Sequence, residues 1–164
     1  MIIRNAISTD VDSILELWKE LMHFHSALDP VFEMSDSADE KFRLFLIQNI
    51  NSPLNKIVKV AEEEGNIVGY MMGTIKQNPP VFKINQCGEI IDACVTANHR
   101  RRQIGESLFV EMKKWFSEQG ITRIDVSAAA KNVISTRFWQ KMGFQPYLNH
   151  MYSYLPEKDG INKV

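Results

Sequence analysis

Three consecutive arginines, Arg100 to Arg102, lie where an apolar strand would pass into an amphipathic helix. Residues 90–95 form the apolar run before them, and Ile104 and Leu108 begin a helical repeat after them. Positive charge at a helix start opposes the helix dipole, so this arrangement is favourable when an anion binds there. Free backbone N–H groups and guanidinium groups would both hold the anion. The alternative is a solvated basic turn.

This segment resembles the acyl-coenzyme A loop of the GNAT acetyltransferase superfamily, whose signature is Q/R-x-x-G-x-G/A. Arg100 fills the first position and Gly105 the last, while Gln103 stands where the middle glycine is usual. Gln103 brings a Cβ and a polar side chain, so the loop remains competent only if that side chain points away from the ligand.

A second segment, from Asn132 to Phe144, is similar to the family's N-x-x-A-x-x-F-Y-x-K-x-G-F block. Ser135 replaces the alanine and Trp139 replaces the tyrosine. The two motifs occur in the expected order, separated by one predicted helix and one predicted strand. On this pattern the chain is identified as a member of the superfamily.

The resemblance implies acetyl transfer from acetyl-coenzyme A to a primary amine of a small molecule or peptide, by direct attack in a ternary complex. The loop amides would bind the pyrophosphate, and the Val95 N–H would polarise the thioester carbonyl. The residues expected to contact the cofactor are Cys94, Val95, Arg100, Arg101, Arg102, Gln103, Ile104, Gly105, Glu106, Ser107, Asn132, Ser135, Phe138 and Trp139.

Family members usually use a carboxylate near the strand as the catalytic base, which makes Asp92 the first candidate and Glu89 the second. Asp92 lies in an apolar strand, so desolvation should raise its pKa towards the working range. Strand alternation predicts that Asp92 shares a face with Ile90 and Cys94, with Glu89 on the other face. The alternative for Asp92 is a structural carboxylate that pairs with an arginine or caps a loop.

The general acid of the family is often a tyrosine at the position of Trp139, and an indole cannot replace it. Water, Tyr147, Tyr152 or Tyr154 are the remaining candidates for this role. Trp139 would then form a wall of the cofactor site or a core contact beside Phe138.

The resemblance assigns acceptor recognition to residues 23–37 and to the loop 77–86, with five candidate side chains in the first segment. These are Phe24, His25, Asp29, Phe32 and Glu33. A non-catalytic acyl-coenzyme A-binding protein that keeps the fold is the alternative function. A nucleic-acid-binding module that uses the three arginines is a weaker alternative, because the net charge of −1 argues against it. A homodimer is compatible with the resemblance.

Hydrophobic periodicity predicts alternating strands and helices, and hence an α/β or α+β sheet with helices on its faces. This order resembles the GNAT fold, which implies a mixed sheet of about six to seven strands flanked by about four helices, in a single domain over residues 1–155 with a tail at 156–164. Strands are expected at 2–5, 56–61, 67–72, 90–95, 121–128 and 151–155. The last segment is short for the two strands usual in the family, so either a tight hairpin forms around Pro146 and Asn149 or a partner chain completes the sheet.

Ser8 to Asp10 is a candidate cap for the first helix, whose apolar stripe begins at Ile14. The two cysteines, Cys87 and Cys94, have an odd separation that predicts opposite faces and no disulfide, and neither has metal-ligand spacing. We expect no metal. No signal-peptide pattern begins the chain and no apolar run approaches 18 residues, so the predicted location is cytoplasmic, without a membrane partner.

Overall fold

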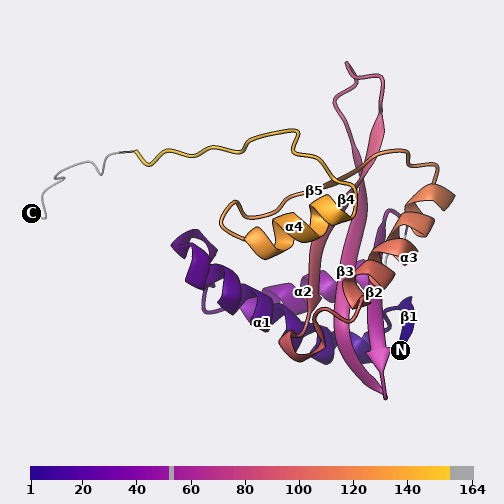
Figure 1. The fold of residues 1–164 in the computed structure, drawn as a ribbon, viewed down its shortest axis with the longest axis vertical. Coiled ribbons are helices and arrows are strands. Elements are labelled where there is room, and N and C mark those ends of the chain that lie inside the picture. The colour runs from indigo at the N-terminus through magenta and orange to yellow at the C-terminus, as the bar shows by residue number, and fades with distance from the viewer. Residues whose placement is uncertain (52–53, 156–164) are drawn as a thin grey trace, which may run out of the picture.

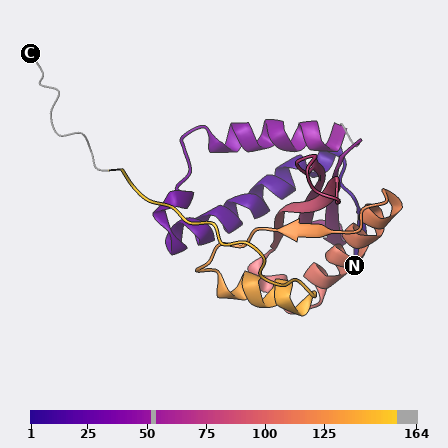
Figure 2. The same cartoon turned by 90° about the horizontal axis from the view of Figure 1, so that it is seen from above.

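The computed structural model describes residues 1–51 and 54–155, which form a central sheet with helices on both faces (Figures 1 and 2). The strands are β1 (Ile2–Asn5), β2 (Lys56–Glu63), β3 (Asn66–Gln77), β4 (Gln86–Val95) and β5 (Ile124–Val126). They lie in sequence order across the sheet. All neighbours are antiparallel except β4 and β5, which are parallel, so the sheet is mixed as predicted.

Four α-helices occur in the described parts of the chain, as predicted: α1 (Val11–Leu28), α2 (Ala38–Asn51), α3 (Ile104–Glu118) and α4 (Val133–Lys141). Short 3₁₀ turns precede and follow α1, at Ser8–Asp10 and Pro30–Phe32, and a third follows β4 at Ala97–His99. Helices α1 and α2 cover one face of the sheet, while α3 and α4 cover the other (Figure 2).

Each face of the sheet has its own core. On the α1 side, Ile14 and Leu46 are fully buried, and the rings of Trp18 and Phe42 stack at a centroid distance of 4.2 Å. On the α3 side, the predicted helical repeat places Leu108 and Met112 against the sheet. The spacing of apolar residues therefore predicted the inward faces of these helices correctly.

The entry to α1 differs from the prediction. Asp10 directly precedes the helix, yet its carboxylate caps no helix amide. It accepts hydrogen bonds from the Ile7 N–H and from the guanidinium of Arg4, which also donates to Glu62 on β2. Asp10 therefore joins β1 to the helix start, because a fixed cation competes better for a carboxylate than neutral amides do.

Within the described residues the sheet has five strands and not six to seven. β5 is shorter than predicted, and residues 145–155 form no strand but run extended away from the domain (Figure 1). Pro146 has no N–H to donate to a strand ladder at the start of this segment. The predicted tail, 156–164, lies outside the described residues. No helix in the described ranges is long and apolar enough to cross a membrane.

Candidate active site

The C-terminal half of β4 has one open edge. β4 pairs with β5 only at residues 88–90 and then continues to Val95 beside β3 alone. The Thr96 N–H donates to the Val68 carbonyl on β3. Because successive amides of a strand alternate in direction, the Val95 N–H points to the opposite edge, where β5 has ended. This is the amide that sequence analysis expected to be available to a ligand.

A β-bulge in β4 changes which residues share a face of the sheet with Asp92. Met72 is opposite Asp92 and Gly73 is opposite Ile90, so Ile91 is an extra residue on β4. Asp92 and Glu89 therefore lie on the same face of the sheet, whereas Ile90 belongs to the core on the other face. The predicted alternation was wrong here because it assumed a regular strand.

The bulge also changes the relation between the two cysteines. Cys87 is opposite Lys76 and Cys94 is opposite Tyr70, and these two β3 residues share a face. The cysteines were expected on opposite faces but lie on the same one. Both are free thiols.

Asp92 is partly buried, and each of its two carboxylate oxygens accepts one hydrogen bond. The Tyr70 hydroxyl donates to Oδ2 at 2.9 Å, and the Ala93 N–H donates to Oδ1 at 2.9 Å. No lysine, arginine or histidine in the described ranges forms an ion pair with it. Burial raises the pKa of Asp92 to about 6, although the two hydrogen bonds act in the opposite direction. Asp92 is therefore a carboxylate suited to accept a proton near neutral pH.

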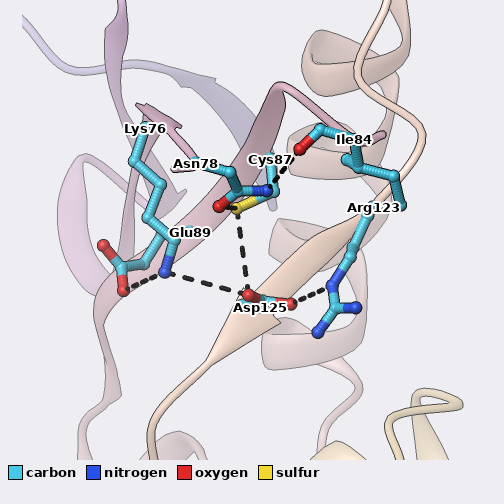
Figure 3. Close-up of polar contacts among 7 residues, drawn as sticks. All are labelled: Lys76, Asn78, Ile84, Cys87, Glu89, Arg123 and Asp125. Carbon is cyan, nitrogen blue, oxygen red and sulfur yellow. Dashed lines mark hydrogen bonds and ion pairs between the residues drawn. The ribbon is translucent and has the colours of Figure 1, made fainter. Parts of the chain in front are cut away.

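Glu89 has a different environment. Its Oε1 accepts a hydrogen bond from Lys76 Nζ at 3.0 Å, and the same lysine lies 3.8 Å from Oδ2 of Asp125 on β5 (Figure 3). Arg123 Nε donates to the other oxygen of Asp125 at 2.8 Å, and the Cys87 thiol contacts the first. Glu89 thus belongs to an ion-pair network that ties β3, β4 and β5 together.

The turn after β4 is attached to α1 through one glutamate. Glu20 accepts hydrogen bonds from the Thr96 hydroxyl, the Ala97 N–H and Arg100. Arg100 also donates from Nε to the Val95 carbonyl at 3.0 Å. Arg100 is therefore engaged within the protein and fixes the turn.

The other two arginines of the turn differ in their contacts. Arg102 lies 4.0 Å from Glu63, which His99 also approaches at 3.5 Å. Arg101 is exposed and forms no ion pair with any described residue. Of the three predicted anion ligands, Arg101 is thus the one whose guanidinium is available.

The start of α3 keeps its amide groups free of any side-chain cap within the described residues. Gln103 directly precedes the helix with φ 63°, the left-handed conformation in which glycine is the usual residue, and its side chain is exposed. The first helical hydrogen bond runs from Ser107 N–H to the Gln103 carbonyl. The amides of Ile104 to Glu106 therefore precede the helical hydrogen-bond pattern, although the Ile104 side chain is buried.

Gly105 allows α3 to lie close to α4. A Cβ at this position would stand 3.2 Å from the Phe138 ring. Glu106 and Lys141 add a 3.0 Å ion pair between the same helices. The glycine of the first motif and the phenylalanine of the second are thus one packing contact.

Asn132 caps α4. Its Oδ1 accepts the Ser135 N–H, which leaves Nδ2 at 3.2 Å from Nε2 of His25 on α1. An amide NH₂ only donates, so Nε2 accepts and the imidazole hydrogen is on Nδ1. Burial lowers the pKa of His25, which favours this neutral form. The side chain of Asn132 therefore has both ends engaged within the protein.

Trp139 is a core residue, with 6% of its surface exposed. Its ring makes edge contacts with Phe109, Phe138 and Phe144. The three tyrosines considered as substitutes for the general acid are exposed on the extended C-terminal segment. Their exposed positions favour none of the three tyrosines as the general acid.

The candidate acceptor residues gather at the end of α1. The His25 ring packs against Phe32 at a centroid distance of 5.2 Å and lies 6.0 Å from Phe24. Asp29 forms a 2.8 Å ion pair with Lys131, just before α4, whereas Glu33 is exposed. The loop 77–86, the other predicted acceptor wall, projects from the end of the sheet (Figure 1).

Sequence reasoning missed two residues of the site, Glu20 and Tyr70. Tyr70 had a detectable signal, because a tyrosine inside an apolar strand usually needs a buried partner for its hydroxyl. Glu20 had none, since its partners are some 76 to 80 residues away along the chain.

Comparison with known proteins agrees with this geometry. Residues 15–144 match the Acetyltransferase (GNAT) family. A search of the curated proteins found no significant match.

Three solved structures illustrate the similarity of the fold. A point mutant of the BH1408 protein from Bacillus halodurans has a TM-score of 0.84 at 20% identity, covering 95% of this chain and all of its own. Aminoglycoside 6'-N-acetyltransferase AAC(6')-Ig from Acinetobacter haemolyticus has a TM-score of 0.76 at 17% identity, covering 95% and 99%. Aminoglycoside N-acetyltransferase AAC(6')-Iy, solved in complex with CoA, has a TM-score of 0.71 at 15% identity, covering 94% and 99%.

Proposed function

Because the chain belongs to the GNAT acetyltransferase family, we propose that it is an acetyl-coenzyme A-dependent N-acetyltransferase acting on a primary amine by direct attack in a ternary complex. The observation that carries this proposal is the placement of Asp92. A carboxylate with a raised pKa lies three residues before the Val95 N–H, on the strand half whose edge is open.

The residues around α3 fit acetyl-coenzyme A. The uncapped amides of Ile104, Gly105 and Glu106 and the free guanidinium of Arg101 suit a pyrophosphate. The backbone of Gln103 already has the left-handed conformation that favours glycine, and its side chain is exposed. The side chain therefore need not block these amides. Asn132, Ser135 and Phe138 would adjoin the rest of the cofactor, with Cys94 and Val95 on the strand. When bound, acetyl-coenzyme A supplies the acetyl thioester.

Asp92 would take a proton from the acceptor amine, directly or through water. A carboxylate with a pKa of about 6 is ionised at neutral pH and still accepts a proton more readily than an ordinary aspartate. The Val95 N–H would donate a hydrogen bond to a carbonyl oxygen at the open edge. Glu89 is the second candidate base, behind Asp92 because it is paired with Lys76.

The acceptor would lie against the end of α1 and the segment before α2. Glu33 and Asp36 are exposed there and pair with no cation among the described residues, which favours a positively charged amine. Structural neighbours named as aminoglycoside acetyltransferases support a small-molecule amine, and a peptide amine is the alternative.

The test is calorimetric titration with acetyl-coenzyme A, followed by an amine panel with a thiol-release readout. The panel contains an aminoglycoside, a linear polyamine and a peptide with a free N-terminus. Micromolar binding with thiol release for one class supports the proposal. Binding without release for any amine would indicate a non-catalytic acyl-coenzyme A-binding protein, and no binding at millimolar cofactor would contradict both functions.

A homodimer and a cytoplasmic location complete the proposal. Six large apolar side chains between Tyr147 and Leu155 are exposed, and β5 pairs on one side only. An uncharged extended segment and an open strand edge are complementary, so the segment of one copy would add to the β5 edge of a second. The location is the one expected from the sequence.

A further inference from the structure

Tyr70 places a hydroxyl group inside a mainly apolar core. Its side chain is fully buried in the core beneath α1, together with Ile14 and Leu17. A phenylalanine would satisfy the packing there equally well. A buried hydroxyl costs free energy unless it is hydrogen bonded, and the partner of this one is Asp92 Oδ2 at 2.9 Å.

The bond depends on the bulge at Ile91. Tyr70 is opposite Cys94 and Met72 is opposite Asp92, so the hydroxyl reaches diagonally across the two strands. If Ile91 were paired in a regular ladder instead, Asp92 would be opposite Met71 and face the α3 side, and Tyr70 would have no acceptor. The irregular strand and the buried tyrosine thus form one arrangement.

We propose that Tyr70 is a positioning residue, whose hydroxyl holds the Asp92 carboxylate in its orientation beside the open edge of β4. This inference rests on the proposed role of Asp92 as the base. The Ala93 N–H holds the other oxygen, so rotation of the carboxylate would break two hydrogen bonds. Each oxygen retains a lone pair, which leaves the group able to accept a proton while it is held.

The groups that face Asp92 allow a clear pH test. Tyr70 on β3 and Cys94 on β4 face it within the sheet, and Glu20 of α1 and Arg100 act on Cys94. Burial, followed by the charge of Asp92, raises the pKa of Tyr70 well above 10. Burial, with Glu20 and Asp92, raises the pKa of Cys94 to about 12. Tyr70 and Cys94 therefore keep their charge between pH 5 and 9, whereas Asp92 changes its charge in this range.

The test is Tyr70→Phe, examined by the pH dependence of kcat/KM and by the carboxyl ¹³C shift of Asp92 in the free protein. The hydroxyl donates to the carboxylate, so its removal should raise the Asp92 pKa by about one to two units. A base must be ionised, so the acidic limb of kcat/KM should move to higher pH by the same amount. At pH 9 the rate should recover to within a small factor of the wild type.

Thr74→Val is the matched control, because it removes another β3 hydroxyl that bonds to the Asn55 carbonyl. It should leave the limb and the Asp92 signal in place. A uniform loss of rate in Tyr70→Phe at every pH, with an unmoved Asp92 signal, would overturn the inference. If Tyr70→Phe fails to fold, 3-fluorotyrosine at position 70 replaces it. This more acidic hydroxyl is a stronger donor and should move the Asp92 pKa downwards, and an unmoved pKa would overturn the inference.

The NMR readout does not depend on turnover. A shifted Asp92 signal in a protein that acetylates no amine would support the positioning contact and contradict the proposed function. An unshifted signal in an active enzyme would contradict the positioning contact alone.

Discussion

At the scale of single residues, two carboxylates that were both candidate bases in the sequence differ in their hydrogen-bond partners. Asp92 and Glu89 share a face of the sheet, yet one is bound by neutral donors and the other by a lysine. A neutral donor holds a carboxylate without neutralising it. The chemical ranking of the two therefore comes from their partners and not from their positions in the strand.

Asp92→Asn should lower kcat/KM by about 10² to 10⁴, the usual contribution of a positioned base. Binding of acetyl-coenzyme A, measured by calorimetry, should change little because Asp92 is not part of the α3 start. Glu89→Gln is the matched change and should cost less activity. A larger loss in Glu89→Gln would transfer the role of base to Glu89.

Arg101→Ala should weaken acetyl-coenzyme A binding about tenfold, since a charge-assisted contact to phosphate contributes roughly 1.5 kcal/mol or more. Arg43→Ala on α2 removes the same charge at a site paired with Asp12 and should leave the affinity unchanged. Titrations at two salt concentrations would show a weaker salt dependence for Arg101→Ala. Equal affinity for acetyl-coenzyme A in the wild type, Arg101→Ala and Arg43→Ala would show that Arg101 does not contact the cofactor.

At the scale of elements, the two sequence motifs meet as a helix contact. Gly105 at the start of α3 lies against Phe138 of α4, while Glu20 attaches α1 to the turn between β4 and α3. The site is therefore assembled from the three helices α1, α3 and α4 and the two strands β3 and β4, which specific side chains join.

Gly105→Leu should destabilise the fold by about 1–3 kcal/mol, the usual cost of overpacking. The thermal midpoint, followed by circular dichroism, would fall accordingly. Phe138→Ala should partly restore it in the double variant, because the two residues share one space. Additive losses would show that the contact does not limit the packing of α3 on α4.

The elements differed in how well the sequence predicted them. The apolar stripe of α1 rests on local chemistry and occurs as predicted. The facing of Asp92 was wrong, because a bulge is an irregularity of pairing that a one-strand pattern does not contain. The role of Asp10 was missed because its partner Arg4 competes with the helix amides.

At the scale of the whole molecule, the domain has a compact body and an exposed C-terminal segment (Figures 1 and 2). The segment 145–155 has no lysine, arginine, aspartate or glutamate, and Tyr147 touches the body through the Arg123 guanidinium at 4.3 Å. The hydrophobic pattern of the sequence predicted a strand there, at 151–155. Such a local pattern does not say which sheet edge a strand will join.

Light scattering with size-exclusion chromatography should give the mass of a dimer. Met151→Lys should shift the protein towards the monomer, because a buried strand position would then carry a charge. Asn149→Lys is the polar-site control and should have a smaller effect. A wild-type protein that is monomeric at tens of micromolar would contradict exchange of this segment between copies.

The bulge at Ile91 has a consequence for how this chain can vary. Its side chain is 40% exposed and takes no part in either core, so most substitutions there should be tolerated. Loss of the residue should be tolerated as well, because Ile90 would stay opposite Gly73 and Asp92 opposite Met72 in a regular ladder. What would turn Asp92 and Cys94 towards α3 is regular pairing with Ile91 retained, which shifts the register by one residue. An alignment of relatives should therefore show many residue types at this position, and gaps as well.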